Sequence, residues 1–108
     1  MAKFSEVYRE TYANAEILAS AVQRFIITEP HKNEYGSGNS LILTSITDNQ
    51  VKVYLDESSV IGILQPYGSL VIKPEDGIFF DGIKLENLGL DAISASQITI
   101  RMARAKEV

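Results

Sequence analysis

The sequence contains no cysteine and no tryptophan, and its single histidine is His31. The absence of cysteine excludes disulfides, thiolate metal sites and thiol nucleophiles. A metal-dependent enzyme on a β scaffold needs several converging imidazoles, which one histidine in a polar segment cannot supply. We therefore predict that His31 is a solvent-exposed loop residue, and that the protein is not an enzyme and uses no metal or cofactor.

Two further motifs of catalysis or ligand binding are missing. The segment Tyr35-Gly36-Ser37-Gly38 does not match the Gly-x-Ser-x-Gly sequence around an activated serine, and it is typical of a flexible loop. The acidic residues beside turns do not follow the spacing of a calcium loop. We interpret them as turn-forming and solubilising residues: Asp56, Glu57, Glu75, Asp76, Asp81 and Asp91.

Size and charge narrow the class of protein. A chain of 108 residues fits one domain. No segment approaches the ~20 apolar residues of a membrane span, and the first residues do not match a signal peptide. The net charge of −4 argues against nucleic-acid binding, which needs cationic groups at the phosphates. We expect no nucleic acid, membrane or small-molecule ligand as a partner.

Charge is unevenly distributed along the chain. Residues 32–91 hold 4 basic and 9 acidic side chains, a balance of −5, whereas residues 92–108 hold 3 basic and 1 acidic, a balance of +2. The basic tail can simply be solvated, or it can dock on an acidic neighbour such as another copy of the chain.

From Phe25 onward the apolar residues alternate with a period of two, as in half-buried strands. Residues 41–47 and 51–55 flank the turn-forming segment Asp48-Asn49-Gln50, which predicts a hairpin. Residues 31–39 are polar and contain two glycines, which predicts a loop. The other predicted strands are residues 25–28, 60–64, 69–73, 78–80, 83–85 and 97–102.

The N-terminal segment fits two structures. Tyr12, Ala15, Leu18, Val22 and Phe25 fall at steps of three and four residues, as on one face of a helix. We predict a short helix over residues 11–21, with an extended strand or arm as the alternative. The predicted organisation is an N-terminal arm or short helix at residues 1–22, a β-sandwich at 23–103 and a basic tail at 104–108.

Short strands separated by turns every ~8–12 residues predict a fold that is mainly β. We expect an antiparallel β-sandwich or a jelly-roll-like small barrel of about seven to eight strands.

The order of four segments resembles a known class of proteins. They are Asn39-Ser40-Leu41-Ile42-Leu43-Thr44, Val51-Lys52-Val53-Tyr54-Leu55-Asp56, Gly62-Ile63-Leu64-Gln65-Pro66-Tyr67-Gly68-Ser69-Leu70 and Gln97-Ile98-Thr99-Ile100. In this order they resemble the small β-sandwich accessory proteins of tailed-phage virions, such as capsid decoration, cement or head-fibre base proteins. The resemblance implies a non-enzymatic virion protein, made in the host cytoplasm, that binds capsid, tail or its own copies as an oligomer.

Candidate interface residues follow from this interpretation, in the apolar N-terminal segment and the basic C-terminal one: Phe4, Val7, Tyr8, Tyr12, Leu18, Val22, Arg101 and Arg104. An alternative hypothesis is a carbohydrate- or receptor-binding module, in which the loop aromatics Tyr35 and Tyr67 grip a sugar. A third hypothesis, an enzyme on a cupin-like sandwich, rests on fold class alone.

Overall fold

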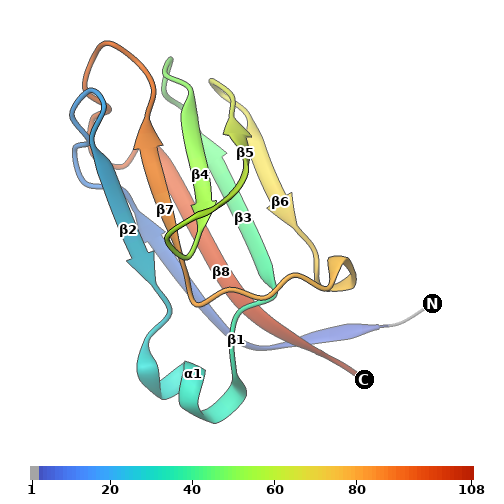
Figure 1. Cartoon of the computed structure of the whole chain (residues 1–108). Helices are drawn as coiled ribbons and strands as arrows, with labels where there is room; N and C mark the ends of the chain where they lie inside the picture. The colour runs from blue at the N-terminus through green and yellow to red at the C-terminus, as the bar shows by residue number, and fades with distance from the viewer. Residues whose placement is uncertain (1–2) are drawn as a thin grey trace.

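Two four-stranded antiparallel sheets, packed face to face, form the framework of residues 3–108, the part of the chain that the computed structural model describes (Figure 1). One sheet has the order β1-β8-β3-β6 and the other the order β2-β7-β4-β5. This arrangement of eight strands is a jelly roll, and it confirms the predicted β-sandwich. The strands of the first sheet are β1 (Phe4–Ala13), β8 (Ile98–Glu107), β3 (Ser40–Ser45) and β6 (Ser69–Ile72). Those of the second are β2 (Val22–Ile26), β7 (Gly82–Asn87), β4 (Val51–Leu55) and β5 (Ser59–Leu64).

The core lies between the sheets and follows the predicted alternation. In β4, Val51, Val53 and Leu55 are buried while the residues between them are partly exposed. In β8, Ile98 and Ile100 are fully buried. Strands of this pattern each bury one face, so the two inner faces together make a single hydrophobic core. Its largest fully buried side chains are Phe80, Ile17, Ile27, Leu41, Leu43, Leu64, Ile83, Leu85, Ile93, Ile98, Ile100 and Met102.

The predicted hairpin over residues 41–55 is wrong. β3 pairs with β6 and β8, whereas β4 pairs with β5 and β7 in the opposite sheet. Residues 46–50 therefore cross from one sheet to the other instead of turning back within one sheet. Turn-forming residues fix where a strand ends, but pairing over long sequence distances decides which strand lies beside it.

The predicted helix over residues 11–21 is also wrong. β1 runs to Ala13 and pairs with β8 along its length, and residues 14–21 are a loop before β2. Long pairing with β8 outweighs a local preference for helix in this segment.

The helix of this protein lies where we predicted a loop. α1 (Glu29–Tyr35) has proline in its first turn, where the missing amide hydrogen costs nothing, and Gly36 follows its last residue at a φ of 94°. A single 3₁₀ turn, η1 (Pro74–Asp76), precedes β7.

The predicted division of the chain does not coincide with the boundaries of the sheets. Within residues 1–22, β1 forms an outer strand of the sandwich, and residues 1 and 2 lie outside the described part. Within residues 104–108, β8 continues to Glu107 and pairs with the start of β1. No helix in the described part of the chain is long and apolar enough to cross a membrane.

Candidate functional site

Four connections gather at one end of the sandwich, and we call this surface the loop end (Figure 1). Consecutive strands run in opposite directions, so the connections after β1, β3, β5 and β7 all reach the same end. α1, η1 and the end of β8 lie at the opposite end (Figure 1). The loop end consists of residues 14–21, 46–50, 65–68 and 88–97.

A buried asparagine ties three of these segments together. Asn87 is only 1% exposed. Its side-chain Nδ2 donates hydrogen bonds to the carbonyls of Ile17 (3.0 Å) and Asp91 (2.8 Å). Its Oδ1 accepts from Gly89 N (2.9 Å) and Asn49 Nδ2 (3.0 Å). Every polar atom of this buried amide is therefore satisfied, and each bond fixes a loop.

A second buried asparagine repeats this arrangement beside β8. Asn14 Nδ2 donates to Ser94 O (3.0 Å), and its Oδ1 accepts from Ile98 N (2.8 Å). The remaining loop joins the others through Gln65, whose Oε1 accepts from Gln50 Nε2 at 2.9 Å. These bonds preorganise the loop end, so a partner that bound it would lose little conformational entropy in ordering it.

The loop end carries exposed large apolar side chains among exposed polar ones. Five large apolar side chains are exposed there, and Leu90 is 96% exposed. Its only charged residues are three acidic ones, and it contains no lysine, arginine or histidine. Single exposed apolar residues are ordinary, but a cluster on one rigid end is typical of a protein-binding surface. The five are Leu18, Ile46, Tyr67, Leu88 and Leu90, and the three acidic residues are Glu16, Asp48 and Asp91.

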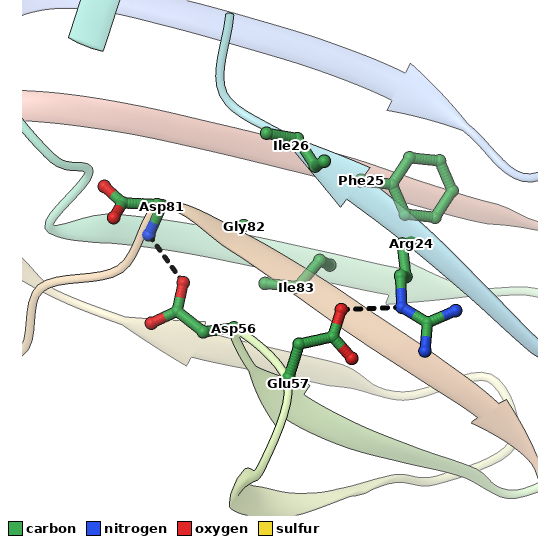
Figure 2. A pocket seen from close by; sticks show the side chains of 8 residues that line it. All are labelled: Arg24, Phe25, Ile26, Asp56, Glu57, Asp81, Gly82 and Ile83. Carbon is green, nitrogen blue, oxygen red and sulfur yellow. Dashed lines mark hydrogen bonds and ion pairs between the residues drawn. The ribbon is translucent and has the colours of Figure 1, made fainter.

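A shallow hollow of about 160 Å³ lies at the opposite end, between β2, β7 and the β4–β5 turn (Figure 2). Its charged groups are already paired. Arg24 Nε donates to Glu57 Oε1 at 2.7 Å, and this hydrogen bond lowers the pKa of the Glu57 carboxyl. Asp56 Oδ1 accepts from the amide of Asp81 at 2.9 Å (Figure 2). Among residues 3–108 no group of three or more histidine, cysteine or carboxylate side chains is arranged to hold a metal ion. The hollow therefore offers no free acid–base pair.

The densest polar cluster lies between the outer strands β1 and β2. Glu10 is buried, with 8% of its surface exposed. Its carboxylate accepts hydrogen bonds from the Thr28 amide (3.0 Å), the Thr28 hydroxyl (2.8 Å) and the Tyr12 hydroxyl. It also accepts from His31 Nδ1 at 2.7 Å, and the imidazole stacks on Tyr8 with ring centroids 4.8 Å apart. We call these five residues the Glu10 cluster.

The Glu10 cluster corrects our prediction for His31. That residue belongs to α1 and not to a loop, and its imidazole, although 40% exposed, pairs with a buried carboxylate. Burial alone would raise the pKa of Glu10, but the hydrogen bonds from Tyr12, His31 and Thr28 together lower it below its ordinary value. The carboxylate is thus held ionised by its donors. A carboxylate–imidazole pair can support hydrolysis when a nucleophile meets its free nitrogen, but here it joins β1 to α1 and closes one side of the sandwich.

Six of the eight predicted interface residues lie on the paired strands β1 and β8, but their side chains point to different surroundings. Tyr8 is buried in the core, Val7 and Tyr12 pack against it, and Phe4 is half-buried. Arg101 forms an ion pair with Glu6 on the outer face of the first sheet.

Three members of the predicted set remain, of which Arg104 pairs with Tyr8 across β1 and β8. Arg104 donates to Ser37 O at 2.9 Å and stacks over Phe79 at the end opposite the loop end. Leu18 and Val22 are exposed, the first at the loop end and the second where β2 begins. Of these interface candidates, only Leu18 belongs to the five exposed apolar residues of the loop end.

The two predicted loop aromatics do not lie together. Tyr35 ends α1 and packs against the core at one end of the sandwich, whereas Tyr67 is at the loop end and 65% exposed. A single sugar site cannot use both. The Asp48 carboxylate lies beside the exposed Tyr67 ring. Its hydrogen bond with the Tyr67 hydroxyl raises the pKa of that group.

Three exposed residues of the loop end were missed by the sequence analysis, namely Ile46, Leu88 and Leu90. The segment Leu88-Gly89-Leu90 carried a signal, because two leucines flank a glycine in a stretch without strand alternation. Large apolar residues in a segment that forms no strand are candidates for an exposed binding surface.

The fold and the site together define an eight-stranded jelly-roll domain with one rigid apolar end. No protein-family model matches the sequence, and no curated protein is detectably similar to it. The function is therefore inferred from the exposed residues of the loop end.

Proposed function

We propose that this protein is a non-enzymatic structural subunit of a virus particle, and that its loop end docks on another protein of that particle. The observation that carries the proposal is the gathering of five exposed apolar side chains on loops that buried asparagines hold in place.

Rigid apolar surfaces favour binding for two reasons. Burying apolar area releases about 25 cal/mol per Å², and a preordered surface avoids the entropy cost of fixing loops. Leu88 and Leu90 stand on either side of Gly89, where an added Cβ would approach the Asn49 side chain to 2.5 Å. The tight packing at Gly89 holds the segment that carries these two exposed leucines against Asn49.

The virion is the context that the resemblance to accessory proteins of tailed phages supports. Jelly rolls are frequent among viral capsid and lectin domains, so the fold is compatible with that context without selecting it. A particle component binds a protein surface by shape and apolar contact, which is what the loop end offers.

The test is co-sedimentation of the purified chain with particles of the virus that encodes it. Leu90→Glu should weaken binding at least ~10-fold, because an apolar contact is replaced by a charge that must be desolvated. Since Leu90 is 96% exposed, folding should be unchanged. Ile26→Glu, at an exposed isoleucine outside the loop end, is the matched control and should bind like wild type. Equal binding by Leu90→Glu and wild type, or no binding by either, would refute the proposal.

A second candidate function is carbohydrate binding at the loop end, favoured by the exposed Tyr67 ring beside Asp48. Aromatic faces stack on sugars and carboxylates accept their hydroxyl groups. A glycan array should then give a signal that Tyr67→Ala abolishes and Tyr35→Ala leaves unchanged. No signal from the wild-type chain, with or without calcium, would remove this candidate.

A further inference from the structure

The two sides of the sandwich, where the edges of the sheets meet, differ in how they are closed. On one side β1 lies beside β2, and the Glu10 cluster joins them. The Tyr12 and Phe25 rings add a tilted contact with centroids 5.8 Å apart. Charged residues also stand on these two strands, including Glu6 and Arg24. This side is polar and charged, and hydrogen bonds of the Glu10 cluster close it.

The other side, formed by β5 and β6, carries no charge at all. Residues 58–72 span both strands and the turn between them without one lysine, arginine, aspartate or glutamate. Among the described residues no side-chain hydrogen bond or ion pair joins β5 to β6. What fills the gap is Leu70, whose Cδ1 lies 3.4 Å from the position a Cβ on Gly62 would take.

This uncharged side also exposes aliphatic side chains. Val71 projects from β6 on the outer face of the first sheet with 49% of its surface exposed, and Val60 and Ile63 project from β5 on the outer face of the second sheet. Each of these residues lies on a strand whose outer edge has no partner within the chain. Proteins ordinarily protect such edges with lysine, other charges or proline, because an unpaired edge attracts another strand. β5 and β6 have none of these residues.

The charge distribution selects the occupant of this side. The chain carries a net charge of −4, and at a two-fold interface the same surface patch meets itself, so a patch of one charge sign repels its copy. The loop end has three acidic residues and no basic one, and the connections at the opposite end hold seven acidic and two basic residues. The β5–β6 side is the surface where two copies can meet without opposing like charges.

We propose that two copies of this chain associate through the β5–β6 side, with β6 pairing antiparallel to β6 of the second copy. β6 is the suitable edge because its pairing with β3 is regular, whereas β5 has a register shift against β4 between Val53 and Tyr54. The pairing would extend the first sheet across the two-fold axis. The Val71 side chains of the two copies would lie next to each other near the axis, on the outer face of the extended sheet.

The experiment is the mass of the full chain in solution, measured by light scattering over a range of concentrations. Wild type should approach twice 11.9 kDa. Val71→Lys should halve that mass, because it places two like charges together at the axis. The matched control is Ile26→Lys, which changes an exposed isoleucine on β2, an edge strand of the charged side, and should keep the wild-type mass.

Hydrogen exchange of the wild-type chain gives a second measurement that needs no variant. Amides of β6 should become more protected as concentration rises, while those of β1 and β2 should not change. A wild-type mass of 11.9 kDa at every concentration would overturn the proposal, as would protection confined to β1 and β2. A dimeric Val71→Lys would overturn it equally.

The dimer does not depend on the proposed function. Leu90→Glu should lose particle binding and keep the dimer mass, whereas Val71→Lys should lose the dimer. The two proposals can therefore fail separately.

Discussion

Asn87→Ala tests whether buried amide bonds hold the loop end together. The substitution removes four hydrogen bonds from a residue that is 1% exposed. A net contribution of about 0.5–1.5 kcal/mol per bond gives about 2–6 kcal/mol for the four. The carbonyl of Ile17 keeps a bond from Ile93 N, and that of Asp91 keeps one from Asn49. Only the Gly89 amide loses its partner outright, so we expect the lower part of this range, about 2–4 kcal/mol.

Urea unfolding followed by circular dichroism measures this loss. With a slope of about 1–3 kcal/mol per molar for a small protein, the midpoint should fall by about 1–2 M. Asn33→Ala is the control, since it makes the same change at an exposed position of α1 and should stay within about 0.5 kcal/mol of wild type. If Asn87→Ala differed from wild type no more than Asn33→Ala does, the loops would not depend on this amide and the rigidity argument would fail.

Two other predictions concern stability. Gly82→Ala should destabilise the protein by about 2–3 kcal/mol, because its Cβ would lie 2.6 Å from the backbone oxygen of Phe25 and force β2 away from β7. Gly77→Ala should cost less, about 1–2 kcal/mol in thermal unfolding, because φ is +68° there but no atom lies within 4 Å of an added Cβ. A larger loss for Gly77→Ala than for Gly82→Ala would contradict the argument that the close contact at Gly82 matters more. Burial, with the hydrogen bond to Glu10, raises the pKa of Tyr12 from 10.0 to about 12, so its stabilising contribution is complete below pH 10 and is lost as pH rises towards about 12. The free energy of unfolding of Tyr12→Phe should fall less steeply than that of wild type over this interval, and parallel curves would show that Tyr12 does not titrate as described.

The positions of most strands could be predicted from the sequence, but their partners could not. Alternation in residues 51–55 marks a strand with one buried face, and β4 is such a strand. The same pattern is equally compatible with a hairpin to β3 and with pairing to β5 and β7. Partner choice depends on how all eight strands share one core, which no local pattern contains.

The N-terminal segment was misinterpreted because its buried face includes a charge. Tyr8, Glu10 and Tyr12 alternate along β1 towards the interior, but a glutamate in that series hides the period of two. Glu10 can be buried only because Thr28 and His31 supply donors from other elements. Sequence offers no signal for such a partner set, since the donors are 18 and 21 residues away.

The loop end was missed for a topological reason. Its four segments are separated in sequence by strands, and they meet only because antiparallel strands alternate in direction. Leu18 and Tyr67 were identified as candidates, yet for different sites, and nothing in their spacing indicates that they share one end of the sandwich.

The two proposed surfaces have a joint consequence. Antiparallel pairing of β6 with its copy makes the strands of the two molecules run in opposite directions, and the loop end lies at one end of these strands. The dimer would therefore present its two loop ends on opposite sides, each with Leu88 and Leu90 exposed. Under both proposals such a dimer would bind two partners at once, and the second contact would gain from the effective concentration set by the first. A chain whose single loop end binds only modestly could thus hold two neighbouring proteins of a particle together, whereas the Val71→Lys monomer would dock on one of them without joining it to the other.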